Sequence, residues 1–128
     1  MSSPYPPHPS APAVPPPAIG HGLQKGAQPD VATLTALWEM MSLSRRTETR
    51  IIELYRQNHV TGGVYTGHGN EATSVGSAWC MAEHDVLVPT HRDMGSHLVR
   101  GHTVEEVLLQ AMKRADSQTG GKDSGLHL

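Results

Sequence analysis

The chain has 128 residues, 37% of them hydrophobic, with no Phe, one cysteine and a formal net charge of -2. No apolar stretch approaches the length of a membrane span and Cys80 cannot form an internal disulfide, so we expect neither a transmembrane protein nor a disulfide-stapled secreted domain. A charge near zero without a Lys/Arg cluster argues against nucleic acid or an anionic membrane as a partner.

Residues 1–29 hold nine of the ten prolines and only one charged residue, Lys25. This composition predicts a disordered Pro-rich tail, because such a segment buries too little apolar area to offset the entropy of ordering. A plain linker is favoured over a Pro-rich docking ligand. The tail has neither the basic start and apolar core of a secretory signal nor the arginines of a mitochondrial presequence, so we expect a cytoplasmic protein. The ordered domain is expected at 30–128.

From Asp30 onward, apolar residues recur at spacings of three and four, which predicts a helix to about Asn58 with Asp30 or Thr33 as its cap. The residues on this spacing are Leu34, Leu37, Trp38, Met41, Glu48, Ile51, Ile52 and Tyr55. Glycines then predict a loop over 61–69. A second helix is expected at about 70–81. One face of it would carry Ala72, Val75, Trp79 and Ala82, and its small residues Gly76, Ser77 and Ala78 would admit another backbone.

Residues 85–89 read Asp-Val-Leu-Val-Pro and predict a short strand that is apolar on both faces, as in a parallel sheet covered by helices. Residues 89–95 would then open a new helical segment. Thr103 and Glu106 have the spacing of a capping box, which predicts the start of a further helix. Residues 117–125 are expected to form a mobile loop.

The nine histidines suggest a metal site, but their spacing does not support one. His91, His97 and His102 lie six and five residues apart, and no pair has the spacing that places two ligands on one helix face. We therefore expect no dedicated metal site. Cys80 is interpreted as a small buried hydrophobe rather than a nucleophile.

The segment 89–95 carries the chemistry of most interest. In doubly wound folds, ligands bind beyond the carboxyl ends of the strands. A guanidinium there, such as that of Arg92, can bind phosphate oxygens in a bidentate manner, and His91 could hydrogen-bond or stack on a ring. Arg92 could equally pair with Asp85 or Asp93 and only stabilise the turn. Spacing alone leaves both interpretations open.

Several short motifs occur together and in order. They are G-N-E-A at 69–72, V-G at 75–76, Asp85, Pro89, H-R-D-M-G at 91–95, Leu98, R-G at 100–101, and G-K-D-S-G-L-H at 121–127. The set resembles the alpha subunits of thiamine-diphosphate-dependent 2-oxo acid dehydrogenases of the pyruvate, branched-chain and acetoin types, over about residues 31–128. His91 stands where that family usually has Tyr, and Asn70 where it has Gln or Glu.

The resemblance implies an α/β fold: the N-terminal portion of a thiamine-diphosphate-binding domain with a parallel sheet and helices on both faces, truncated and mostly helical in this chain. It implies oxidative decarboxylation of a 2-oxo acid with acyl transfer to lipoamide. The implied cofactors are thiamine diphosphate and Mg²⁺. The implied partners are the beta subunit, in a heterotetramer, and the lipoyl-bearing acyltransferase of the complex.

By the same resemblance, Arg92 would hold the diphosphate and His91 would lie beside the cofactor. Tyr65, four residues before the G-N-E-A motif, falls where relatives place an active-site histidine and is assigned to the substrate pocket. His127 matches a loop histidine that would approach the mouth of the pocket, although a solvated loop histidine fits equally well. Glu71 is interpreted as structural, because the glutamate that activates the cofactor comes from the beta subunit in this family.

No catalytic residue is assigned. The G-D-G motif with a downstream Asn, which holds the metal and diphosphate in the family, does not occur in the sequence. We therefore expect a fragment of the alpha subunit that is inactive alone. The alternative is a non-catalytic helical module that binds a partner, or a decayed gene product.

Overall fold

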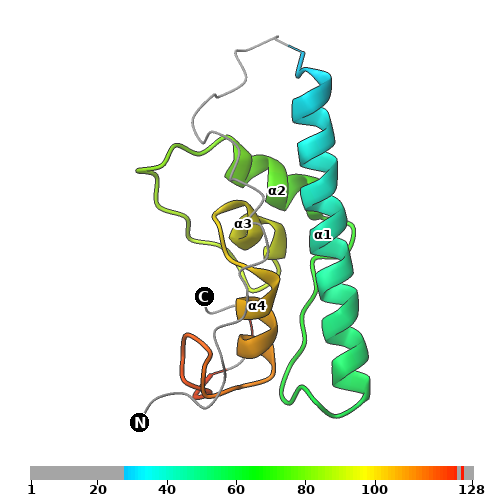
Figure 1. The fold of residues 1–128 in the computed structure, drawn as a ribbon, viewed down its shortest axis with the longest axis vertical. Helices are drawn as coiled ribbons and strands as arrows, with labels where there is room; N and C mark the ends of the chain where they lie inside the picture. Colours follow the sequence, from blue (N-terminus) through cyan, green and yellow to red (C-terminus); the bar gives the residue numbers. More distant parts are fainter. Residues whose placement is uncertain (1–27, 124, 126–128) are drawn as a thin grey trace, which may run out of the picture.

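The computed structural model describes residues 28–123 and 125, in which four helices are joined by irregular segments (Figure 1). The helices are α1 (Val31–Arg56), α2 (Glu71–Trp79), α3 (Met94–Val99) and α4 (Val104–Ala111). Of the Pro-rich tail predicted for 1–29, residues 1–27 lie outside the described part of the chain. No helix within that part is long and apolar enough to cross a membrane.

Helix α1 begins where the sequence predicts. The Asp30 carboxylate accepts a hydrogen bond from the backbone N–H of Thr33 at 2.7 Å, which satisfies one of the free donors of the first turn. The helix ends at Arg56, two residues before the predicted end. Asn58 adopts a positive φ of 61°, a conformation that Asn tolerates better than most residues, and this turns the chain out of the helix.

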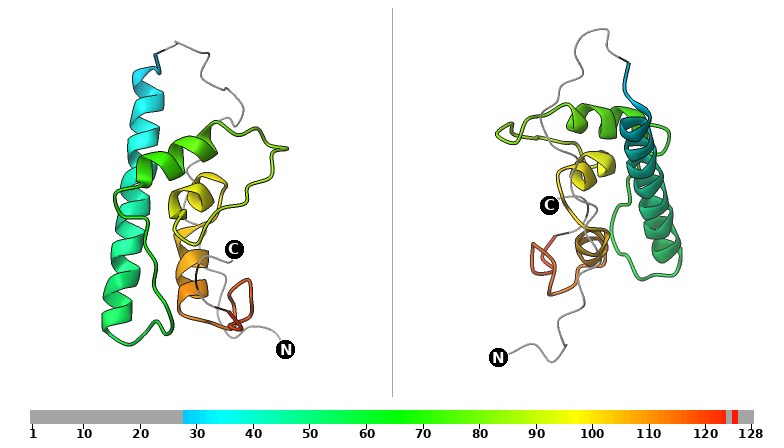
Figure 2. Two further views of the ribbon diagram at one scale, coloured as in Figure 1. Left: turned by 180° about the vertical axis from the view of Figure 1, so that it is seen from behind. Right: turned by 45° about the horizontal axis from the view of Figure 1, so that its top comes forward.

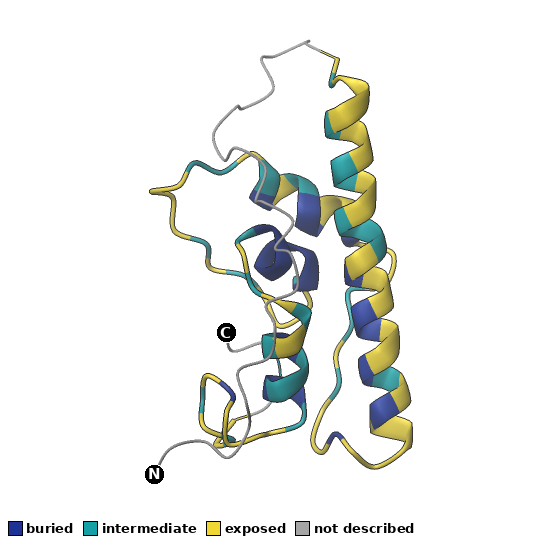
Figure 3. Ribbon diagram, viewed as in Figure 1, coloured by how far each residue is buried: buried dark blue, intermediate teal, exposed yellow. Residues whose placement is uncertain are grey.

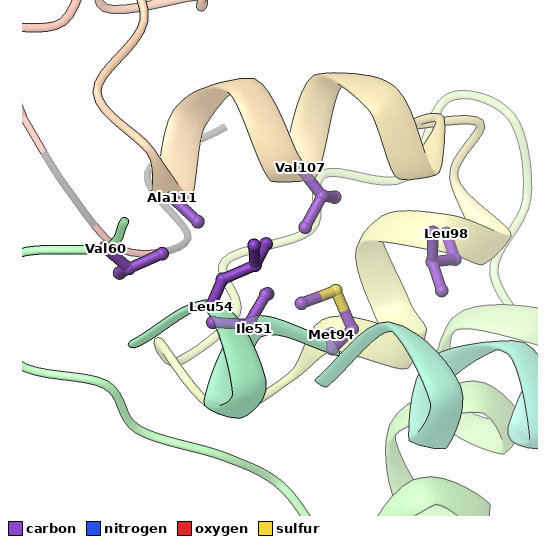
Figure 4. Packing of buried hydrophobic residues seen from close by; sticks show 7 residues of the cluster. All are labelled: Ile51, Leu54, Val60, Met94, Leu98, Val107 and Ala111. Atoms are coloured by element: carbon purple, nitrogen blue, oxygen red, sulfur yellow. The ribbon is translucent and has the colours of Figure 1, made fainter. Parts of the chain in front are cut away.

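One side of α1 packs on α2, α3 and α4, and the other faces solvent (Figure 3). The main hydrophobic cluster joins the second half of α1, Val60, α3 and α4, and its side chains point toward one another (Figure 4). Its buried members are Ile51, Leu54, Val60, Met94, Leu98, Val107 and Ala111. The capping box at the start of α4 is confirmed: the Thr103 hydroxyl accepts from the Glu106 N–H at 3.1 Å, and the Glu106 carboxylate accepts from the Thr103 N–H at 2.7 Å.

The first turns of α1 extend past α2 (Figure 1), so part of the predicted apolar stripe has no cover there. Leu34 and Trp38 are 51% and 64% exposed. Tyr55, near the other end of the helix, is also exposed. The predicted helix is therefore confirmed, but its buried face is shorter than the apolar pattern suggested.

Helices α2 and α3 form the closest helix pair. Ser96 donates its backbone N–H to the Ser74 hydroxyl at 2.9 Å and its own hydroxyl to the Ser74 carbonyl at 2.9 Å. A Cβ on Gly95 would lie only 2.6 Å from Val75 Cγ2. The small residue that permits the close approach is thus Gly95 of α3, whereas the predicted Gly76 faces open space. Ala72, predicted on the packed face, is exposed.

The strand predicted for 85–89 is wrong. Among the described residues there is no strand, and Val86 and Val88 are 83% and 88% exposed. Figure 2 shows this segment extending away from α2 and α3. A strand is stabilised by hydrogen bonds to a neighbouring strand, and an apolar sequence alone supplies none of them. The predicted α/β class is accordingly not observed in this part of the chain, which is helical.

Candidate functional site

The glycine-rich loop 61–69 is fixed by two buried carboxylates. Glu48, on α1 and 2% exposed, accepts a hydrogen bond from the Gly67 N–H through Oε1 at 2.7 Å. Glu71, in the first turn of α2, accepts from the Gly69 N–H at 3.1 and 3.2 Å. A charged acceptor makes these bonds stronger than neutral ones. The loop therefore has a defined position against α1 and α2.

The pKa values of the two carboxyl groups are shifted in opposite directions. The guanidinium of Arg45 forms an ion pair with Glu71 and, together with backbone N–H groups, lowers the Glu71 pKa to about 2. Burial raises the pKa of Glu48 above its ordinary value, although the Gly67 N–H and His68 oppose this. Glu71 is thus a firmly ionised anchor, whereas Glu48 is a carboxyl whose charge is disfavoured by its surroundings.

The turn that precedes α3 places Arg92 at the surface. The Asp93 carboxylate is occupied, because it accepts from the Thr90 N–H at 2.7 Å and from the Thr90 hydroxyl at 2.9 Å. Asp85 accepts from the Ala82 N–H at 2.7 Å. Within the described residues, neither aspartate pairs with Arg92 and no ion pair involves its guanidinium. Of the two interpretations left open by the sequence, the structural pair is not observed.

The loop 61–69 and the turn 89–93 meet. The Tyr65 and His91 rings are in edge contact, with centroids 4.6 Å apart and an interplanar angle of 64°. Gly67 lies so close to the turn that a Cβ there would be 2.2 Å from the Arg92 carbonyl oxygen. Three of the four residues predicted for the site, Tyr65, His91 and Arg92, are therefore neighbours. The fourth, His127, lies outside the described residues.

A small cavity lies behind the loop. Its volume is about 30 Å³, and Glu48, Tyr65, Thr66, Val64, Ile51 and Met94 are among its lining residues. Such a space holds about one water molecule and is far too small for a cofactor. A ligand at Tyr65 and His91 would therefore lie on the exposed side of the two rings.

The histidines give no metal site in the described part of the chain, where no three His, Cys, Asp or Glu side chains gather. His97 and His102 are in ring contact at 5.5 Å, and burial lowers the pKa of His97. Cys80 follows the last residue of α2 and is exposed, so its interpretation as a buried hydrophobe is wrong.

Sequence reasoning did not assign a role to Glu48. The signal was present, because a carboxylate at a core-facing position of an otherwise apolar stripe is rare unless it has a partner. Its partner, the backbone of a loop 19 residues away, could not be found from spacing.

Comparison with known proteins identifies the family. Residues 39–127 match the family model described as "Dehydrogenase E1 component". The 3-methyl-2-oxobutanoate dehydrogenase subunit alpha of Mycobacterium tuberculosis is 41% identical over 54% of this chain and 18% of the relative. The mitochondrial pyruvate dehydrogenase E1 component subunit alpha of Pisum sativum is 31% identical over 73% of the chain and 24% of the relative. The mitochondrial pyruvate dehydrogenase E1 component subunit alpha, somatic form, of Rattus norvegicus is 29% identical over 84% of the chain and 29% of the relative.

No solved structure matches the chain. The matched part spans between about a fifth and three-tenths of the length of these relatives. The family model covers well over half of the chain, including loop 61–69 with Tyr65 and the turn 89–93 with His91 and Arg92. The chain belongs to the dehydrogenase E1 component family.

Proposed function

We propose that this chain is the N-terminal part of the alpha subunit of a 2-oxo acid dehydrogenase and contributes one wall of its thiamine diphosphate site. The observation that carries the proposal is the meeting of two segments distant in sequence. Loop 61–69 brings Tyr65 against His91, and the turn 89–93, which contains His91, presents Arg92 at the surface. An exposed ring pair beside a guanidinium suits a ligand with an aromatic ring and a phosphate.

The residues fit part of the cofactor. Arg92 has no ion pair among the described residues, so its five N–H donors can serve a diphosphate, and His91 can contact a ring. Thiamine diphosphate, when bound, supplies the electron sink for decarboxylation of a 2-oxo acid. The protein's share here is binding and orientation, and we assign Tyr65 to the substrate pocket. No cluster of ligands suited to Mg²⁺ exists in the described residues, so we assign no residue to that metal.

The proposed partners follow from the relatives, which are named as alpha subunits. We propose that the chain, as part of such a subunit, acts with a beta subunit in a heterotetramer and passes the acyl group to a lipoyl-bearing acyltransferase. We further propose that it works in the cytoplasm and turns over no 2-oxo acid alone. Pyruvate or branched-chain oxo acid turnover by the purified chain with thiamine diphosphate and Mg²⁺ would contradict the last point.

The test is cofactor affinity of an alpha subunit that contains this chain, paired with its beta subunit. A hydrogen bond to a charged group contributes about 1.5–3 kcal/mol, so Arg92→Ala should weaken thiamine diphosphate binding about ten- to a hundredfold. Arg92→Lys should recover only part, because it keeps the charge but loses the planar fork. The exposed Arg46→Ala is the control. An unchanged dissociation constant in Arg92→Ala, measured by calorimetry alongside the melting temperature, would contradict the assignment.

A second candidate function is a helical module that binds a partner without catalysis. The exposed apolar residues Val86, Val88 and Trp38 favour it, at 83%, 88% and 64% exposure. The same calorimetry separates the two candidates. A chain that forms the alpha–beta assembly but binds no thiamine diphosphate would support the module.

A further inference from the structure

The buried carboxyl of Glu48 joins the helical core to the candidate site. Its Oε1 accepts the Gly67 N–H at 2.7 Å. Its Oε2 is buried without a hydrogen-bond partner and lies 3.6 Å from Nε2 of His68. A buried oxygen without a partner is costly, and this one is close to a group that can carry or accept a proton.

The short segment 65–67 connects Glu48 to the Tyr65 and His91 rings. Gly67, its hydrogen-bond partner, is two residues from Tyr65 and lies in close contact with the Arg92 carbonyl. Tyr65 contacts His91, the residue before Arg92. We therefore expect a displacement of Gly67 to change how the Tyr65 ring meets His91.

The strength of the Gly67 hydrogen bond depends on the charge of Glu48. An ionised acceptor forms a stronger and shorter bond than a neutral carboxyl does. Three charged or titratable groups act on Glu48: His68 from the loop, Arg45 from its own helix and Glu71 from α2. His68 and Arg45 favour the ionised form, and Glu71 opposes it, as burial does.

We propose that Glu48 is a positioning residue for the Tyr65–His91 pair, and that gain or loss of its proton, in contact with His68, tightens or loosens loop 61–69 against the turn 89–93. The ionised carboxylate holds Gly67 and attracts a protonated His68. The neutral carboxyl holds Gly67 more weakly and leaves Tyr65 freer to move. The proposal concerns the two rings themselves and is independent of which ligand binds beside them.

The test follows the 128-residue chain by NMR as a function of pH, with the Glu side-chain carboxyl carbons and the Tyr and His rings labelled. The Tyr65 ring signals should shift in a step with the same midpoint as the Glu48 carboxyl. Glu48→Gln keeps an oxygen acceptor for the Gly67 N–H but has no charge to lose. It should therefore retain the ring contact and abolish this step.

The control is Glu53→Gln, an exposed carboxylate on the same helix that pairs with Arg50 at 2.9 Å. This variant should leave the step unchanged. A Tyr65 step that persists in Glu48→Gln would overturn the proposal. If Glu48→Gln does not fold, the wild-type titration decides alone: coincident midpoints for Glu48 and Tyr65 support the proposal, and a Tyr65 signal that stays constant while Glu48 titrates overturns it.

Discussion

Two irregular segments of this chain are held in different ways. Loop 61–69 links α1 to α2 and is anchored at two points by buried carboxylates of those helices. Segment 82–90 links α2 to α3 and is held by the guanidinium of Arg100. That group donates to the carbonyls of Ala82, Glu83 and Asp85 at 3.1–3.2 Å.

The difference shows what fixes a segment without regular structure. The glycine-rich loop has little apolar surface, yet polar anchors from the core set its position. Segment 82–90 contains the apolar stretch 86–89, yet Val86 and Val88 face solvent because nothing among the described residues packs on them. The candidate site uses the anchored loop, and the orientation of Tyr65 is thereby tied to the helices.

The largest expected effect comes from Gly67→Ala. The added Cβ would lie 2.2 Å from the Arg92 carbonyl oxygen, and backbone atoms cannot move aside cheaply. We expect a loss of about 3 kcal/mol in the free energy of unfolding, measured by urea titration. Gly76→Ala is the matched control. Its Cβ meets open space inside α2, so it should stabilise the chain by about 0.5–1 kcal/mol. Equal effects at both glycines would contradict the close contact between loop and turn.

Two valines sharpen the contrast between core and exposed segment. Val75 is 0% exposed, whereas Val88 is 88% exposed. Loss of two buried methyl groups and the resulting cavity should cost about 2 kcal/mol in Val75→Ala. Val88→Ala should stay within about 0.5 kcal/mol of the wild type. A large loss in Val88→Ala would mean that segment 82–90 is covered in solution.

The anchor at Glu71 should show in the pH dependence of stability. Because its folded pKa is about 2, below the ordinary value of 4.5, Glu71 stabilises the chain above pH 4.5, and this is lost as pH falls toward 2. Glu71→Gln should lower the free energy of unfolding by about 1.5 kcal/mol at pH 7. Only a small part of this loss should come from the ion pair with Arg45, because that guanidinium is half-exposed. Urea titrations should show the difference from wild type shrinking between pH 4.5 and 2. A difference that stays constant over this range would be inconsistent with an ionised anchor.

A smaller loss of stability than at Gly67, Val75 or Glu71 is expected at Arg100. Its hydrogen bonds to segment 82–90 are partly exposed, so Arg100→Ala should cost about 1 kcal/mol. Amide hydrogen exchange should rise in residues 82–90 and stay unchanged in loop 61–69. Equal increases in both segments would show that the two are not held independently.

The sequence was most informative where a signal is local. The Asp30 cap, the Thr103–Glu106 capping box and the three-four spacing of α1 depend on neighbouring residues and are confirmed. The prediction of a strand at 85–89 was wrong because a strand requires hydrogen bonds to another strand, which can lie far away in the sequence. Family motifs predicted Tyr65, His91 and Arg92 as site residues; the structure brings these residues together, and their role stays a prediction. The buried anchor Glu48 was missed because its partner is a loop amide far along the chain.

The claim that the loop and the turn form one site is tested most directly by NMR contacts between the Tyr65 and His91 rings. With centroids 4.6 Å apart, their ring protons should give nuclear Overhauser cross-peaks in the 128-residue chain. These cross-peaks should disappear in Gly67→Ala and remain in Gly76→Ala. Assigned ring signals without cross-peaks in the wild type would contradict the claim.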